Sequence, residues 1–414
     1  MPKEFIDMVL DCVGKDVPSL KSCSLVSREW LYPARRRLFQ TLRVMSRHDT
    51  RSFDAFLVLL NYAQGVCVSV RELHLIGFDT HSHSGAISHY LLRTILDKLP
   101  SLQTLSIDRC YWSPSTEYSG HALKSLRKLS IRTLFLFDFI HFVDILSLFS
   151  NIEELDVCDI KWTESFALST PAEIPPHDIK QYVTRLSPGF RVGELCIENT
   201  ENFMAFLWCL KELPFMRSLT TLNIRKLFPD PLDTHPEGVE YFAELLRDTG
   251  PTLLNCKIRL PQMYGYWEMN TAPIDALAAL DLSHCAILHS IELNVTVCGG
   301  LNGIRGPRYP PIVQYKKTPW YAVTILLSLA PTTLQHITLV LNMYGEDEGI
   351  YKQLVLAPDW QELEHTFLRF PKLRTVTILQ ESHHPNGSSL NTERQELFSM
   401  RLPSLQEKGA LHFA

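Results

Sequence analysis

The stretches LRKLSI at residues 126–131 and IEELDV at residues 152–157 carry the pattern that decides the fold. Each has apolar side chains at its first, fourth and sixth positions, so the last two alternate with a polar residue, as in a strand with one buried face. The same pattern occurs ten times, the other copies being VRELHL (70–75), LQTLSI (102–107), VGELCI (192–197), LTTLNI (219–224), LLNCKI (253–258), LHSIEL (288–293), LQHITL (334–339) and LRTVTI (373–378). Since successive copies lie 24 to 46 residues apart, they predict a repeat protein with irregular spacing.

Helical patterns of apolar residues lie between the copies. Several of them stop at a proline just before the next strand, as at Leu99-Pro100 and Phe370-Pro371. The expected helices cover residues 54–62, 87–99, 139–149, 203–213, 239–246, 321–329 and 360–370. The end of the chain, from Ser388 to Ala414, is expected to form a terminal helix and a capping strand around Leu411 and Phe413. A strand, a crossover helix and the next parallel strand form a unit that buries its apolar edge against its neighbours. The fold class predicted is therefore an α/β solenoid with parallel strands.

We call the repeated six-residue pattern the template. It resembles the leucine-rich-repeat consensus, and its copies cover nearly all of residues 68 to 380. This resemblance implies an irregular, horseshoe-shaped solenoid that binds a target protein, which we assign to residues 68–414. The asparagine position of the family is mostly unfilled here, with Cys110, Asn199 and Cys285 as scattered candidates.

The first 44 residues have a different character: MPKEFIDMVLDCVGKDVPSLKSCSLVSREWLYPARRRLFQTLRV. Their apolar spacing predicts three short helices, with Gly14 ending the first, Pro18 opening the second and Ser27 capping the third. Pro33 either kinks the third helix or splits it. A segment of this size buries too little apolar surface to be stable alone, and it has no metal-ligand spacing or cysteine pairing, so a protein partner is expected.

Residues 1–44 resemble an F-box, especially its fungal form. The match consists of Pro2-x-Glu4-Phe5-Ile6, the run Ser22 to Val26, Trp30 and Arg35-Arg36-x-Leu38-Phe39, whereas the family usually has leucine where this chain has Met1. The resemblance implies that these helices pack on the Skp-type adaptor of a cullin-RING ubiquitin ligase. Carried over position by position, the adaptor-binding residues would be Pro2, Phe5, Ile6, Leu20, Leu25, Val26 and Trp30. Residues 45–67 would form a connecting helix between the F-box-like segment and the solenoid.

Composition limits the other classes of function. Of the 414 residues, 45% are hydrophobic and 21% charged, and the net charge is −5, which argues against a general nucleic-acid or membrane-surface binder. The N-terminus lacks the apolar core of a signal peptide, and the run from 134 to 149 is too short and too often interrupted by charge to span a bilayer. Ten cysteines are scattered without any Cys-x-x-Cys, as in reduced intracellular proteins. We therefore expect a soluble protein of the cytoplasm, the nucleus or both.

Longer insertions interrupt the repeats at residues 161–190, 227–237, 261–275 and 299–319. The last is rich in glycine and carries four cations, but prolines follow its glycines where a phosphate-binding loop needs a helix, so a flexible basic loop is the better interpretation. His81 with His83, and His383 with His384, lack nearby partners for zinc, and no catalytic motif of a known class is present. Neither a cofactor nor a metal is expected.

Charged residues between the inward positions of the strands suggest where a target would bind. The fourth and fifth copies present acids and the sixth and seventh present bases; the candidate residues are Glu154, Asp156, Glu194, Glu198, Arg225, Lys257 and Arg259. Because neighbouring strands lie about 4.8 Å apart, like charges on them would form patches. The alternatives are an ordinary solvated sheet face and a two-signed concave surface that orients a partner.

The sequence thus leads to a non-catalytic substrate-recognition subunit of an SCF-type ubiquitin ligase, which would contact cullin and RING subunits through the adaptor. The alternative is a leucine-rich-repeat scaffold that binds proteins without joining a ligase, its N-terminal helices serving as a cap. The identity of the target cannot be read from the sequence, because a solenoid surface encodes specificity in three dimensions.

Overall fold

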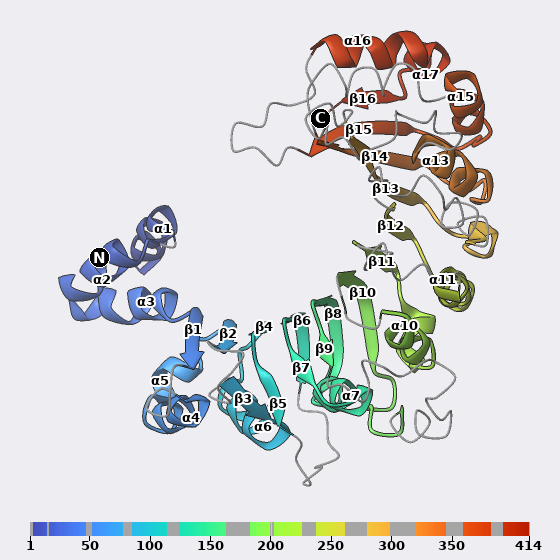
Figure 1. The fold of residues 1–414 in the computed structure, drawn as a ribbon. Coiled ribbons are helices and arrows are strands. Elements are labelled where there is room, and N and C mark those ends of the chain that lie inside the picture. Colours follow the sequence, from blue (N-terminus) through green and yellow to red (C-terminus); the bar gives the residue numbers. More distant parts are fainter. Residues whose placement is uncertain are drawn as a thin grey trace, which may run out of the picture. The chain divides into compact units, whose positions relative to one another are not determined.

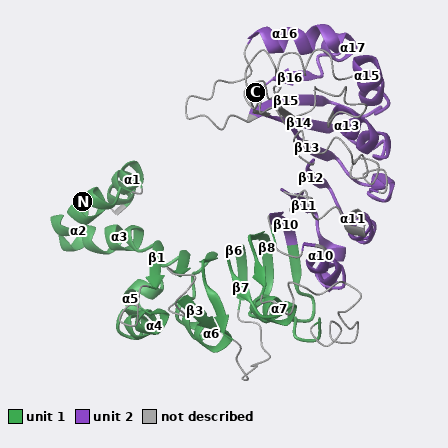
Figure 2. Ribbon diagram, viewed as in Figure 1, with its two compact units in different colours: residues 1–192, 200–202 green, residues 193–199, 203–414 purple. Residues whose placement is uncertain are grey.

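The computed structural model describes residues 3–14, 16–46, 52–77, 85–113, 124–162, 183–198, 200, 203–225, 237–260, 280–298, 319–344, 359–381 and 392–413. The chain divides into two compact units (Figure 2). The first comprises Met1–Val192 with Thr200–Asn202, and the second comprises Gly193–Asn199 with Phe203–Ala414. Each unit is described by itself below.

The first unit begins with three short helices, α1 (Lys3–Val13), α2 (Val17–Val26) and α3 (Arg28–Leu38). Gly14 adopts a left-handed conformation (φ 63°) and its N–H donates to the carbonyl of Leu10, so it ends α1 as predicted. The side chain of Asp16 caps α2 by accepting from the N–H of Ser19. The third helix continues through Pro33, so of the two alternatives the split is excluded.

The main sheet of the first unit is parallel, with the order β1 (Thr41–Ser46), β2 (Glu72–Gly77), β4 (Thr104–Asp108), β6 (Lys124–Arg132) and β8 (Phe149–Cys158). The middle apolar residues of the repeat template lie opposite one another and are fully buried: Leu73, Leu105, Leu129 and Leu155. The predicted strands and their inward face are therefore confirmed. The sequence template does not include β1, which pairs with β2 and begins the sheet.

A second, smaller parallel sheet has the order β3 (Ala86–Ser88), β5 (Tyr111–Ser113), β7 (Phe135–Leu136) and β9 (Lys161–Trp162). From β4, β6 and β8 the chain passes to this sheet through a residue with positive φ: Arg109 (53°), Thr133 (46°) and Asp159 (55°). The N–H groups of Arg109 and Thr133 donate to the carbonyls of Arg132 and Cys158 in the next repeat. The repeat therefore includes a left-handed corner that links neighbouring units.

The helices of the first unit are α4 (Phe53–Tyr62), α5 (Gln64–Cys67), α6 (His89–Lys98) and α7 (Phe139–Ser147). Figure 1 shows α6, α7 and the second sheet on the same side of the main sheet. Ser52, Ser88 and Asp138 cap α4, α6 and α7 with their side chains. The predicted helices at 54–62, 87–99 and 139–149 are confirmed, except that Ile87 belongs to β3 and Phe149 begins β8.

The second unit contains one parallel sheet, with the order β10 (Arg191–Glu198), β11 (Thr221–Ile224), β12 (Asn255–Arg259), β13 (Ser290–Cys298), β14 (His336–Tyr344), β15 (Thr375–Glu381) and β16 (Leu411–Phe413). A buried row crosses it, formed by Leu195, Leu222, Cys256, Ile291, Ile337 and Val376. These are again the middle residues of the template, and the predicted terminal strand is confirmed.

Helices on one side cover the sheet of the second unit (Figure 1). They are α10 (Phe203–Lys211), η4 (Pro214–Ser218), α11 (Glu237–Thr249), η7 (Leu282–His284), α13 (Pro319–Ser328), α15 (Trp360–Leu368), α16 (Thr392–Arg401) and α17 (Pro403–Glu407). The rings of Trp320 and Phe398 lie 5.7 and 5.6 Å from that of Trp360, so one aromatic cluster joins α13, α15 and α16.

The coarse prediction of an α/β repeat fold with parallel strands is thus confirmed. Within the described residues, no helix combines the length and apolar character needed to cross a bilayer.

Candidate interaction surfaces

Among the described residues of the N-terminal helices, four are buried and form a small core. These are Ile6, Leu10, Leu20 and Ala34, and the partly buried Val13, Cys23, Trp30 and Leu38 pack against them. Arg37 of α3 ties the helices together, because its Nη1 lies 2.5 Å from Oδ1 of Asp11 and its Nη2 donates to the carbonyl of Asp7 at 3.2 Å. The three helices therefore pack as a unit around a core that is small for their size.

The predicted adaptor-binding residues separate into two groups. Ile6 and Leu20 are each only 2% exposed and belong to the core, with Trp30 packed against it. Phe5, Leu25 and Val26 are exposed to 47%, 85% and 66%. Pro2 lies outside the described residues.

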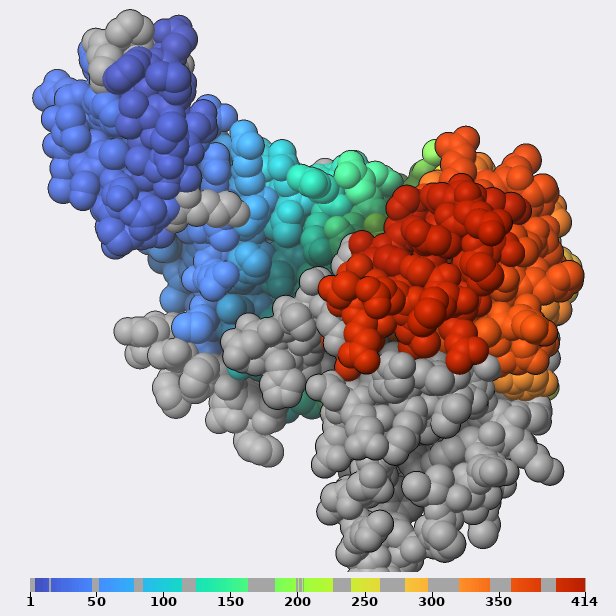
Figure 3. Space-filling model, turned by 90° about the horizontal axis from the view of Figure 1, so that it is seen from above, coloured from blue at the N-terminus to red at the C-terminus, as the bar shows by residue number. Residues whose placement is uncertain are grey.

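Three further exposed apolar residues were not among the predicted set: Met8, Val17 and Tyr32. Met8 follows Phe5 by three positions and so lies on the same helix face, which is a signal that the sequence contains. We call Phe5, Met8, Val17, Leu25, Val26 and Tyr32 the exposed apolar set. Figure 3 shows the helices that carry it, in dark blue, projecting from the rest of the first unit.

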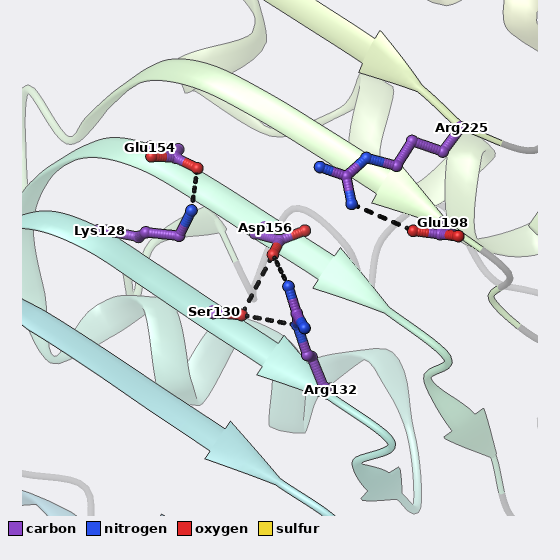
Figure 4. Close-up of polar contacts among 7 residues, drawn as sticks. All are labelled: Lys128, Ser130, Arg132, Glu154, Asp156, Glu198 and Arg225. Carbon is purple, nitrogen blue, oxygen red and sulfur yellow. Dashed lines mark hydrogen bonds and ion pairs between the residues drawn. The ribbon is translucent and has the colours of Figure 1, made fainter. Parts of the chain in front are cut away.

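The charged candidates of the first unit are paired with opposite charges on the neighbouring strand (Figure 4). Lys128 of β6 pairs with Glu154 of β8, its partner in the strand register. Asp156 is only 2% exposed at its side chain; its Oδ2 lies 2.9 Å from Nη2 of Arg132 and accepts from the hydroxyl of Ser130 at 3.2 Å. Glu154 and Asp156 of β8 therefore each form an ion pair with a basic residue of β6.

Among the charged candidates of the second unit, Glu198, Arg225 and Lys257 show the same arrangement. Nη1 of Arg225 lies 3.2 Å from Oε2 of Glu198 (Figure 4), and Nζ of Lys257 lies 3.2 Å from Oε2 of Glu292. Glu194 and Arg259 are half-buried on β10 and β12. Each unit thus presents cross-strand ion pairs on the solvent-facing side of its sheet.

Three of these ion-pair partners were not among the residues predicted from the sequence: Lys128, Arg132 and Glu292. Lys128 and Glu154 both occupy the third position of their repeat copies, and Lys257 and Glu292 both occupy the fifth. Because copies pair in register, equal template positions on neighbouring strands predict facing side chains. Comparing those positions would have found both pairs.

Buried cysteines occupy structural positions. The thiol of Cys110 donates to the carbonyl of Asp108 and lies near that of Leu75, and the thiol of Cys285 lies 4.0 Å from the carbonyl of Leu246 in α11. Burial raises the pKa of Cys110 to about 12 and that of Cys285 to about 11. Both thiols contact backbone carbonyls. Asn199, the third candidate for the asparagine position of the repeat, lies outside the described residues.

A buried polar cluster lies at the N-terminus of α6 and on α7. Nη1 of Arg185 lies 2.5 Å from Oδ1 of Asp144. His89 and His141 lie close enough for both charges to affect the pKa of their imidazoles. Burial lowers the pKa of each histidine, an effect that Asp144 opposes. Burial is the larger influence, so both imidazoles favour the neutral form.

Several sequence candidates fall outside the description. His81, His83, His383 and His384 lie outside the described residues, as does the glycine-rich insertion apart from Pro319. Among the residues that are described, no group of three or more histidine, cysteine or acidic side chains is arranged to hold a metal ion.

Comparison with known proteins gives no assignment. No family model matches the chain, and no curated protein matches its sequence.

Proposed function

We propose that this chain is a substrate-recognition subunit of an SCF-type ubiquitin ligase, with α1 to α3 acting as an F-box that binds a Skp-type adaptor. The observation that carries the proposal is the position of Leu25 and Val26. They are consecutive apolar residues at the end of α2, within the F-box-like motif, and are exposed to 85% and 66%. A small helical segment that leaves such residues exposed is suited to a permanent partner.

The energetics support a stable complex. Burying a large apolar side chain contributes roughly 1.5–3 kcal/mol. Ordering and association costs offset part of this, so several side chains have to be buried together. Without Tyr32, the exposed apolar set has five members, Phe5, Met8, Val17, Leu25 and Val26, which is enough in number for the apolar part of a protein interface.

The repeat sheets would bind the target protein. Their solvent-facing sides carry half-exposed ion pairs such as Lys257–Glu292 and Arg225–Glu198, which can exchange partners with charges on another protein. In this function the chain makes and breaks no covalent bond. It holds the target near the ubiquitin-carrying enzyme, and its contribution is proximity.

Adaptor capture tests the proposal directly. The full chain, co-expressed with a Skp-type adaptor, is expected to copurify with it, and the double variant Leu25→Glu/Val26→Glu is expected to lose it. Leu59→Glu is the matched control, because Leu59 is a similarly exposed leucine (59%) on α4, outside the F-box-like segment.

Circular dichroism of all three proteins checks that the helices persist. Absence of adaptor in the wild-type purification, or equal loss in the Leu59 control, would contradict the proposal. The first of these results would leave a binding scaffold without a ligase as the better interpretation.

A further inference from the structure

The first unit contains a cleft of about 800 Å³ that the proposed function does not use. Its lining includes four arginines, Arg28, Arg36, Arg37 and Arg71, together with Asp7 and Glu29. The volume falls within the range of about 300–1,000 Å³ that is usual for ligand pockets. A concentration of arginine is unexpected in a chain whose net charge is −5.

The walls of the cleft are held in place by the fold. Arg28, Tyr32 and Arg36 follow one another at intervals of four residues and lie along one face of α3. Arg71 is fixed against the end of α3, because the carbonyl of Gln40 accepts from the N–H groups of Arg71 and Glu72 at 2.8 and 2.9 Å. The arginines therefore face a site whose backbone is ordered before any ligand binds.

The positive charge of the cleft is only partly compensated. The charge of Arg37 is neutralised by two carboxylates. Its Nη2 lies 4.0 Å from Oδ1 of Asp7, and its Nη1 lies 2.5 Å from Oδ1 of Asp11. For Arg28, Arg36 and Arg71, the described residues supply no ion-pair partner, and all three are exposed. Guanidinium groups bind carboxylate and phosphate oxygens through paired hydrogen bonds, so the surplus charge favours an anionic ligand.

We propose that this cleft binds an anionic peptide segment, whose carboxylate or phosphate is held by Arg28, Arg36 and Arg71. The rest of the lining favours a peptide over a nucleic acid. Asp7 and Glu29 would repel a continuous polyanion, whereas Ile6, Tyr32 and Pro33 offer apolar contacts to the side chains that flank a single anionic residue. This inference is independent of the proposed function.

Fluorescence anisotropy with designed probes tests the inference. Three labelled nine-residue peptides share a leucine- and glycine-containing frame and differ only at the centre, which is phosphoserine, glutamate or serine. We expect the full chain to bind the phosphoserine probe, the glutamate probe or both, and to bind the serine probe at least ten times more weakly. Added inorganic phosphate and higher salt should each weaken binding.

Substitutions locate the site. Arg28→Gln, Arg36→Gln and Arg71→Gln should each weaken binding of the anionic probe about five- to ten-fold, since each removes a charged hydrogen-bond donor. Arg35→Gln is the matched control, because Arg35 is also exposed on α3 but does not line the cleft. Leu25→Glu should leave probe binding intact, which separates this site from adaptor binding.

Three outcomes would overturn the inference. The first is equal affinity for the serine probe, or no binding of either anionic probe at millimolar concentration. The second is an Arg35→Gln variant that weakens binding as much as the cleft variants. The third is a single-stranded oligonucleotide that binds more tightly than the peptides and depends on the same arginines, which would assign the cleft to nucleic acid instead.

Discussion

Asp156 and Glu154 are neighbouring acids of β8 that should contribute differently to stability. The side chain of Asp156 is buried and bonded to Arg132 and Ser130, whereas Glu154 is 38% exposed in its pair with Lys128. Removing a buried carboxylate that accepts from the buried hydroxyl of Ser130 costs about 1–3 kcal/mol, while an exposed ion pair contributes about 0–1 kcal/mol. We therefore expect Asp156→Ala to lower the free energy of unfolding more than Glu154→Ala does, as measured by urea denaturation. Equal effects would mean that the Asp156 network contributes no more than a surface pair.

The buried histidines predict a dependence of stability on pH. Burial lowers the pKa of His89 and His141 from the usual 6.5 in the folded chain, so below pH 6.5 the unfolded chain binds more protons than the folded one. The free energy of unfolding should therefore decrease as the pH falls through 6.5. His141→Gln should make this decrease smaller, as seen in denaturation curves at pH 7.5 and 5.5. A variant with an unchanged decrease would show that His141 is not involved.

The reactivity of the cysteine thiols tests which of these side chains are buried. Burial raises the pKa of Cys110 and of Cys256, so at pH 8 they are thiols rather than reactive thiolates. Cys12 is exposed on α1. Iodoacetamide should label Cys12 in the folded chain and reach Cys110 and Cys256 only after denaturation, as read by peptide mass spectrometry. Labelling of Cys256 at the rate of Cys12 would contradict the packing described for β12.

The exposed apolar set shows what sequence reasoning could not resolve at the residue scale. Helical spacing places Ile6, Leu20, Leu25 and Val26 among the apolar positions but does not say which face meets the other helices. That choice depends on how α1, α2 and α3 cross, which involves side chains far apart in the sequence. Only the packed structure separates the core residues Ile6 and Leu20 from the exposed Leu25 and Val26.

At the scale of elements, the strands of the main sheets other than β1 were predictable and those of the second sheet were not. Ten strands repeat an apolar pattern six residues long, and this is enough to identify them without an alignment. In contrast, β3, β5, β7 and β9 are only two or three residues long, which is too short for any periodicity. A left-handed corner at Arg109, Thr133 or Asp159 redirects the chain from β4, β6 or β8 into β5, β7 or β9.

Gly77 tests how closely neighbouring repeats approach at such a corner. A Cβ atom at Gly77 would lie 1.9 Å from the carbonyl oxygen of Arg109, so the backbone would have to move. We expect Gly77→Ala to destabilise the first unit by about 1–3 kcal/mol, in the range of other overpacked sites.

The control for Gly77 is Gly65→Ala in α5, where a Cβ would meet nothing within 4 Å. This change should be neutral or stabilising by up to about 1 kcal/mol, because it reduces the entropy of the unfolded chain. Thermal unfolding of the two variants gives the comparison. A neutral Gly77→Ala would show that the corner has room that the structure does not indicate.

At the scale of the whole molecule, each compact unit has its own buried row of template residues. In a repeat fold, a strand and its helix contact mainly their immediate neighbours, so the effect of a local change decays along the array. Leu129 is in the row of the first unit and Ile337 is in that of the second, and both are fully buried. Truncating either to alanine should cost about 2–5 kcal/mol locally.

Hydrogen exchange can show whether these costs stay within one unit. Leu129→Ala should accelerate amide exchange in β4, β6 and β8 while leaving β14 and β15 near their wild-type rates, and Ile337→Ala should do the reverse. The two variants control for each other, because each removes a similar volume from an equivalent position of the template. Equal acceleration in both units by either variant would mean that the chain unfolds as one cooperative body. Under the proposed function, a target bound to the sheet of the second unit would then stabilise helices α1 to α3 as well, whereas independent units would let target and adaptor bind without mutual influence.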